Sequence, residues 1–189
     1  MNVLIILASI REARQTHRLA HFLNQRLEQR GVNVRLLDLQ KMDIPAFGTP
    51  VPDSSDIDQI KNCLNHSDAM IFVSPEYHQS YSSTLKSFSE YYWPEFSRKP
   101  IGVATASAGK LGGVHASMQL QSLVLALGGY PIPIRLMAAK IHELFDQNNQ
   151  PLHSEFEQNT KDFLDEFISF GQKLCTASEI VDQEIKTHG

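Results

Sequence analysis

Two hydroxyl and two guanidinium side chains lie close together near the amino terminus. They follow the apolar run 3–8 and come just before a segment of helical periodicity: Ser9, Arg11, Arg14 and Thr16. Backbone amides at a helix amino terminus are unpaired, and the helix dipole favours negative charge there. Hydroxyls and arginines donate hydrogen bonds to an anion. The loop therefore suits a phosphate monoester; the open alternative is that Ser9 and Thr16 cap the helix and the arginines are solvated.

A second polar loop follows the apolar run 69–74. It reads Pro75-Glu76-Tyr77-His78-Gln79-Ser80-Tyr81, with polar and aromatic groups that a simple connection does not need. Pro75 fixes one backbone dihedral, so the amides after it are held in place and can bind the edge of a planar heterocycle, with Tyr77 packed beside it. The alternative is a rigid turn with exposed tyrosines.

The third loop is rich in small residues and follows the apolar run 101–106. It reads Ser107-Ala108-Gly109-Lys110-Leu111-Gly112-Gly113. Small residues allow the backbone to approach a flat ligand closely. The loop is not a Walker A motif, because Lys110 is followed by Leu111 and no Ser or Thr is present to hold magnesium. The alternative is a flexible turn into a helix.

Five short apolar runs alternate with longer helical segments, which is the pattern of βαβ units around a parallel sheet. We predict strands, each mostly apolar, at Val3–Ala8, Val32–Leu37, Ala69–Ser74, Ile101–Ala106 and Tyr130–Ile134. Right-handed crossovers then give a flavodoxin-like α/β fold, a three-layer sandwich with a five-stranded parallel sheet in the order 2-1-3-4-5. In this order the carboxyl ends of the first, third and fourth strands open into one crevice, so the three loops meet there.

Helices are predicted from apolar residues spaced three or four apart. The first carries Leu19, Leu23 and Leu27 and stops at Gly31, a residue suited to the left-handed cap. Others are predicted at 55–65, 82–92 and 114–127, and a last one starts with a capping box at Ser154. The alternative fold is a Rossmann dinucleotide domain, which has a glycine-rich GxGxxG loop after strand one and an acidic residue at the end of strand two. Asp38 can be that acidic residue, but the loop 8–16 lacks the required glycines.

Length and composition set further limits. The 189 residues fit one domain, which we assign to residues 1–177, with a polar carboxyl-terminal tail at 178–189. The net charge of −4 shows no excess of Lys and Arg, so nucleic acid is not an expected partner. Two distant cysteines give no disulfide framework and fit a reduced cytoplasm. No stretch approaches the roughly 20 apolar residues that cross a bilayer, so we expect no membrane partner.

The other side chains predict neither a metal site nor a set of catalytic residues. His17 and His21 have the i, i+4 spacing of metal ligands, but no third ligand is evident, and we predict no metal site. No Ser-His-Asp order or carboxylate pair can be assigned. We therefore predict no catalytic residue of the protein's own, since in cofactor enzymes the protein supplies position and electrostatics.

The three loops also carry a resemblance. The stretches 8–11, 75–81 with Leu85-Lys86, and 107–113 resemble the NADPH-dependent FMN reductase family, which includes flavin, quinone, chromate and azo-dye reductases. The likeness spans about residues 2–174. It implies non-covalent FMN, with its phosphate on the first loop and its isoalloxazine on the other two. The FMN-binding residues that it implies are Ser9, Arg11, Thr16, Pro75, Glu76, Tyr77, Ser107, Gly109 and Gly112; we add Arg14 and His78 from their places in the same loops.

The chain departs from the family pattern at four places. Ala8 replaces the usual Gly, His78 the usual Asn, Ser82 a common Pro, and Ser87 a common Asn. The first two bear on flavin affinity and acceptor range. An imidazole at position 78 titrates near neutral pH, so a protonated His78 beside the flavin would raise the reduction potential as pH falls; the alternative is that it points to solvent.

The resemblance implies an enzyme that passes electrons from NADPH or NADH to a small oxidised acceptor. Quinones, free flavins, azo compounds and metal oxyanions are the acceptor classes. Family members are commonly dimers or tetramers, and we expect a homodimer with the aromatic helix Tyr81–Trp93 at or near the contact. The alternatives are a flavodoxin-type electron carrier and a flavin-free interaction module of the same fold.

Overall fold

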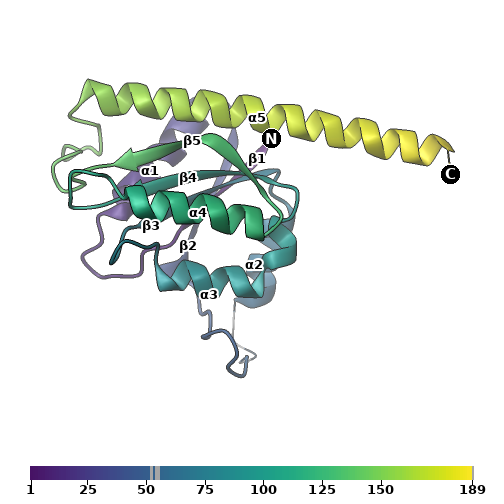
Figure 1. The fold of residues 1–189 in the computed structure, drawn as a ribbon, viewed down its shortest axis with the longest axis horizontal. Coiled ribbons are helices and arrows are strands. Elements are labelled where there is room, and N and C mark those ends of the chain that lie inside the picture. Colours follow the sequence, from purple (N-terminus) through teal and green to yellow (C-terminus); the bar gives the residue numbers. More distant parts are fainter. Residues whose placement is uncertain (52, 54–55, 189) are drawn as a thin grey trace.

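A central parallel sheet organises the molecule (Figure 1). The computed structural model describes residues 1–51, 53 and 56–188, with backbone alone for 177–188. Five strands pair in parallel in the order β2-β1-β3-β4-β5, which confirms the predicted flavodoxin-like topology. Their bounds are β1 Asn2–Leu7, β2 Asn33–Asp38, β3 Ala69–Pro75, β4 Pro100–Ala106 and β5 Tyr130–Ala138.

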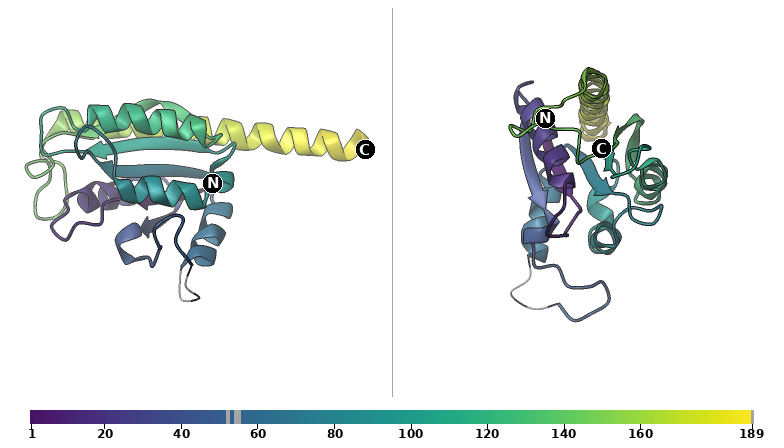
Figure 2. Two further views of the ribbon diagram at one scale, coloured as in Figure 1. Left: turned by 60° about the horizontal axis from the view of Figure 1, so that its bottom comes forward. Right: turned by 90° about the vertical axis from the view of Figure 1, so that its left-hand side faces the viewer.

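Helices cover both faces of the sheet, as the end-on view in Figure 2 shows. The first hydrophobic core holds α1 and α5 on one face, and the second holds α2, α3 and α4 on the other. Alternate residues of β1 point to opposite cores: Ile5 to the first and Leu4 to the second. The helices are α1 Thr16–Glu28, α2 Ile57–Asn65, α3 Ser83–Tyr91, α4 Val114–Ala126 and α5 Ser154–His188, with short 3-10 turns η1 Leu39–Lys41 and η2 Trp93–Phe96.

Local sequence explains where these elements begin and end. The apolar stripe of α1 is buried, and Gly31, with φ +72°, takes the left-handed conformation just beyond the helix. The strand β5 runs four residues beyond the predicted end at Ile134, because its exposed edge residues interrupt the apolar pattern. The helix α5 continues to His188, so the predicted tail from residue 178 begins inside it.

The aromatic side of α3 is largely core. Leu85, Phe88 and Tyr92 pack in the second core, while Trp93 is 61% exposed. The stripe that suggested a dimer surface therefore mostly faces the sheet. No helix in the described part of the chain has both the length and the apolar character of a membrane span.

Candidate cofactor site

The loops after β1, β3 and β4 meet at the carboxyl ends of their strands. Parallel pairing brings the ends together: the Ala8 amide donates to the Val73 carbonyl at 2.9 Å, and the Glu76 amide to the Ala106 carbonyl at 3.0 Å. A cavity of about 320 Å³ opens between the loops. It is lined by Arg11, Ala13, Arg14, Gln15, Thr16, Pro75, Glu76, Tyr77, Ala106, Ser107, Ala108, Ile141 and His142.

The amino terminus of α1 lies at this cavity and has no side-chain cap. Thr16 is the first residue of α1, and the N-cap residue Gln15 makes no side-chain capping bond. The Ser9 hydroxyl is fully buried and lies 3.2 Å from the Tyr77 hydroxyl, so it does not cap the helix. The Arg11 guanidinium lies over the Tyr77 ring, 5.6 Å from its centre. The Arg18 amide already donates to the Gln15 carbonyl at 3.0 Å, so the amides of Thr16 and His17 are the ones in the first turn of α1 that remain available to an anion.

Arg14 has a different position from Arg11. Its guanidinium donates to both Asp38 carboxylate oxygens at 2.6 Å, and also to the Ser9 carbonyl. The pair ties the first loop to the end of β2. Burial tends to raise the pKa of Asp38, but the hydrogen bonds from Arg14 and from the Gln40 amide outweigh it and hold that pKa below its usual value.

This pairing also bears on the Rossmann alternative. Both oxygens of Asp38, the acid after strand two, accept from one arginine and are not free for a ribose. The confirmed strand order 2-1-3-4-5 belongs to the flavodoxin-like class.

The second loop contains a tight hairpin. Tyr77 and Ser80 exchange two backbone hydrogen bonds, of 2.8 and 2.9 Å. Between them, His78 and Gln79 have φ of +49° and +63°. Two successive positive φ angles define a type I′ turn, for which Asn-Gly is the favoured pair. His78 is exposed at the tip of the turn and does not line the cavity.

The helix α4 holds this hairpin from the side. The Gln119 amide donates to the Gln79 carbonyl at 2.8 Å, and its oxygen accepts from the Ser80 hydroxyl at 2.7 Å. The Glu76 carboxylate accepts from the Ala116 amide at 2.9 Å, at the positive end of the α4 dipole. Sequence reasoning did not identify Gln119, because a glutamine within a helix carries no pattern of its own.

Ser82 connects the first and second loops. Its hydroxyl donates to the Ala8 carbonyl at 2.8 Å and accepts from the Leu85 amide at 3.2 Å as the N-cap of α3. Serine is a good N-cap residue. This gives a physical reason for serine where the family commonly has proline.

The third loop folds back on the sheet. A Cβ on Gly112 would lie 2.9 Å from the Met137 Cβ and 3.0 Å from the Ala139 nitrogen, and Gly112 has φ +62°. Gly113, with φ +88°, is equally close to Thr105. At Gly109, by contrast, the nearest atom is the Ser107 hydroxyl at 3.8 Å. The absence of a side chain at Gly112 and Gly113 thus serves the close approach of the loop to β4 and β5.

The predicted residues divide into two groups. Seven of them line the cavity: Arg11, Arg14, Thr16, Pro75, Glu76, Tyr77 and Ser107. The other four lie behind or beside the lining: Ser9, His78, Gly109 and Gly112. The segment after β5 adds Ile141 and His142, which sequence reasoning missed because that segment has neither a periodic pattern nor a motif.

The charges of the lining favour an anion. Arg11 lines the cavity without a carboxylate partner among the described residues, Arg14 is paired with Asp38, and Glu76, the one carboxylate of the lining, bonds to α4. A phosphate monoester with a planar ring therefore fits the residues present.

The two histidines of α1 lie apart from this cavity. The rings of His17 and His21 are 6.2 Å apart, edge to face, and burial followed by repulsion from His17 lowers the pKa of His21. Among the described residues, no group of three or more His, Cys, Asp or Glu is placed to hold a metal ion.

Comparison with known proteins places the chain among flavoenzymes. Residues 1–143 match the family model described as NADPH-dependent FMN reductase. An FMN-dependent NADPH-azoreductase of Staphylococcus saprophyticus is 27% identical over 184 residues, covering 90% of this chain and 95% of the relative. Azoreductases of Staphylococcus aureus strains have the same identity and coverage.

Solved structures share the fold. The flavoenzyme NAD(P)H:(acceptor) oxidoreductase FerB of Paracoccus denitrificans superposes with a TM-score of 0.77 at 23% identity, covering 91% of this chain and 97% of that one. An NAD(P)H:quinone oxidoreductase of Methanothermobacter marburgensis has a TM-score of 0.59 at 15% identity, covering 92% and 96%. At these identities the likeness shows the architecture alone.

Proposed function

The chain belongs to the NADPH-dependent FMN reductase family, so it is an FMN-dependent oxidoreductase that takes electrons from NAD(P)H, and we propose that FMN binds in the crevice between the three loops. Bound FMN supplies the ring that accepts and donates hydride. The chain itself binds and orients this group. The observation that carries the proposal is the uncapped amino terminus of α1 beside Arg11, in a lining whose one carboxylate is bonded elsewhere.

The phosphate is assigned to the first loop. Arg11 and the amides at Thr16 offer charge and N–H donors. Ser9 is buried behind the lining, so we assign it to holding the Tyr77 hydroxyl, 3.2 Å away, at the edge of the phosphate site. Arg14 positions this loop through Asp38, while Arg11 is the arginine that meets the anion.

The planar ring is assigned to the second and third loops. Pro75 and Tyr77 of the second loop and Ser107 of the third line the cavity. Glu76, through its bond to Ala116, fixes the second loop against α4. We assign Gly109 to close backbone approach, since it has room around its Cα, and Gly112 to holding the loop on β5.

A titration with flavins tests the site. We expect one FMN per chain, a yellow protein, and weaker binding of FAD, because the loops offer one phosphate site. A colourless protein that releases no heat on addition of FMN contradicts the proposal.

For the acceptor we propose a quinone or an azo compound. Relatives are named as azoreductases, and a structure of the same fold as a quinone oxidoreductase. NADPH oxidation by the FMN-loaded protein, followed with a benzoquinone and with an azo dye, tests this. No acceleration by either compound would rule out both classes.

We also propose a cytoplasmic homodimer. The support from the aromatic segment is now confined to Trp93, the first residue of η2, which is 61% exposed, whereas Phe88 and Tyr92 are core residues. Light scattering at micromolar concentration is expected to give twice the chain mass, and the monomer mass would refute the dimer.

A further inference from the structure

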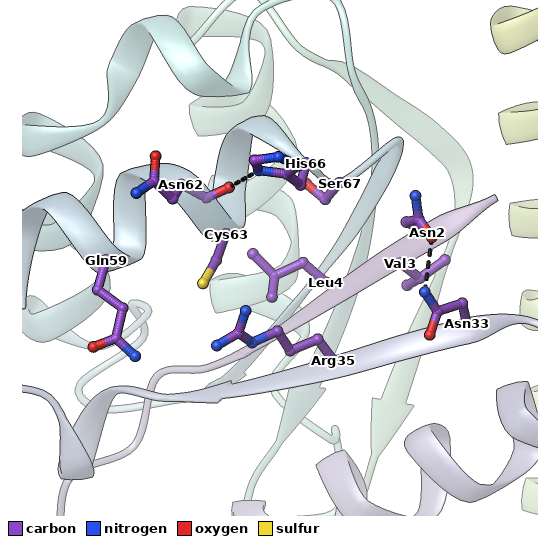
Figure 3. Close-up of a pocket in the computed structure, with 10 residues that line it drawn as sticks. All are labelled: Asn2, Val3, Leu4, Asn33, Arg35, Gln59, Asn62, Cys63, His66 and Ser67. Carbon is purple, nitrogen blue, oxygen red and sulfur yellow. Dashed lines mark hydrogen bonds between the residues drawn. The ribbon is translucent and has the colours of Figure 1, made fainter.

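A second cavity, of about 710 Å³, is lined by the first residues of β1 and β2, so it lies at the opposite end of these strands from the three loops. Figure 3 shows the side chains that line it. It opens between the amino-terminal parts of β1 and β2 and one side of α2. About 16 Å of extended chain separates Leu4, in this cavity, from Ser9, in the first loop. None of the residues assigned to FMN lines it. Its lining is Asn2, Val3, Leu4, Asn33, Arg35, Gln59, Asn62, Cys63, His66 and Ser67.

Strand register and helix spacing together build this cavity. Leu4 pairs with Arg35, so both side chains leave the sheet on the face that α2 covers. One side of α2 carries Gln59, Asn62 and Cys63, spaced by three and four residues. Leu4 and Cys63 are 1% and 8% exposed and form an apolar floor beside Arg35.

The polar side chains above this floor differ in their bonding: those of Asn33, His66 and Ser67 are hydrogen-bonded, whereas three exposed ones have no partner among the described residues. Arg35 makes no hydrogen bond or ion pair within the described chain, whereas Arg14, Arg26 and Arg30 each meet a carboxylate. The side-chain amides of Gln59 and Asn62 are equally unbonded among the described residues. No Asp or Glu is present among the described residues of the lining, so their fixed charge is that of one guanidinium.

We propose that this cavity binds a small aromatic carboxylate. The planar guanidinium of Arg35 matches a carboxylate through two parallel hydrogen bonds. The side-chain amides of Gln59 and Asn62 in the lining offer further donors, and the ring of the ligand would lie against the Leu4 and Cys63 side chains, which Figure 3 shows next to Arg35. The volume lies within the usual range for small-molecule sites.

The same geometry favours a carboxylate over a phosphate. The lining takes residues from the carboxyl-terminal half of α2, where the helix dipole is negative and opposes a dianion. The His66 ring nitrogen Nδ1 donates to the Asn62 carbonyl at 2.7 Å, at this same end. One guanidinium balances one negative charge, so a monoanion fits.

A titration of the FMN-saturated protein tests the proposal, with the flavin crevice already filled. The probe is 2-naphthoate, followed by the NMR signal of the Arg35 Nε–H and of the Gln59 and Asn62 side-chain amides. Its matched neutral analogue is 2-naphthylmethanol, and 2-naphthyl phosphate is the dianionic arm. We expect saturable shifts with 2-naphthoate, and at least tenfold weaker binding of both other compounds.

Variants separate the site from the rest of the surface. Arg35→Gln is expected to weaken 2-naphthoate binding at least tenfold and to leave FMN binding unchanged. Arg98→Gln is the matched control, since Arg98 is exposed and outside the lining, and it should bind 2-naphthoate as the wild type does. Equal binding of the neutral analogue, shifts confined to the three loops, or full binding by Arg35→Gln would overturn the proposal.

Discussion

The polar side chains at the two ends of the sheet differ in whether they hydrogen-bond one another. At the carboxyl end, side chains of different loops bond one another, as Arg14 does with Asp38 and Gln119 with Ser80. At the amino end, Arg35, Gln59 and Asn62 face a larger cavity without partners in the described chain. The shape of the cavity at the carboxyl end, where we propose that FMN binds, therefore depends on a hydrogen-bonding network, although the cavity at the amino end has the larger volume. This comparison yields predictions about the network, in order of decreasing effect.

The largest effect is expected where the third loop touches the sheet. Gly112→Ala adds a Cβ 2.9 Å from Met137 at a positive φ, so we expect it to lower the free energy of unfolding by about 2–4 kcal/mol. Gly109→Ala is the matched control, because its Cβ has no neighbour closer than 3.8 Å. Urea denaturation measures both, and equal losses would show that the close approach at Gly112 is unimportant.

The next effect concerns the pair that ties the first loop to β2. Asp38→Asn removes the negative charge that pairs with Arg14, so we expect it to lower the free energy of unfolding by about 1–3 kcal/mol at pH 7. Because the folded-state pKa of Asp38 lies below the unfolded one, its contribution is present above the unfolded pKa and disappears as pH falls through the folded pKa. Wild-type stability should therefore drop more steeply than that of Asp38→Asn on acidification below about pH 4. Parallel curves would contradict the ion pair.

A smaller effect is expected at the hairpin clamp. Gln119→Ala removes two hydrogen bonds from the turn, and we expect FMN binding to weaken by about 3- to 10-fold. A glycine at position 79 adopts the positive φ without strain. In the Gln79→Gly background, Gln119→Ala should therefore weaken FMN binding less. Ser122→Ala, at an exposed position of the same helix, is the control and should have no effect. Additive losses in the double variant would show that Gln119 does not restrain the turn.

The smallest effect is expected at His78. Because its side chain is exposed and outside the lining, the flavin potential of His78→Asn should follow that of the wild type from pH 5.5 to 8. Asparagine tolerates positive φ better, so the variant should gain about 0.5 kcal/mol in stability. An inflection present in the wild type alone would place the imidazole near the flavin.

The sequence predicts the fold well because each strand and helix carries its own pattern. The buried strands and the stripe of α1 are periodic, and loops at strand ends must meet once the strand order is known. What it could not predict are contacts between residues that lack a local pattern. Ile141 enters the crevice and Gln119 reaches the hairpin only through the packing of α4 and of the segment after β5.

The same limit applies to the motif residues themselves. The sequence alone does not distinguish the role of Arg11 from that of Arg14. In the structure, Asp38 at the end of β2 pairs with Arg14, whereas Arg11 lies over the Tyr77 ring. The glycines of the third loop look alike, and only the position of β5 separates Gly112 from Gly109. The cavity at Arg35 gives no sequence signal, because its residues form no motif within β1, β2 or the segment from α2 to Ser67.

Whether the FMN phosphate binds on the first loop is tested most directly with Arg11→Ala and two ligands. FMN carries the phosphate and riboflavin does not, so loss of a charge-assisted contact should weaken FMN binding by about 1.5–3 kcal/mol and leave riboflavin binding nearly unchanged. Calorimetric titration of both ligands into the wild type, Arg11→Ala and the control Arg98→Ala measures this difference. Selective loss of FMN affinity in Arg11→Ala is the predicted result. Equal losses for FMN and riboflavin would contradict the account, because Arg11 would then not contact the phosphate.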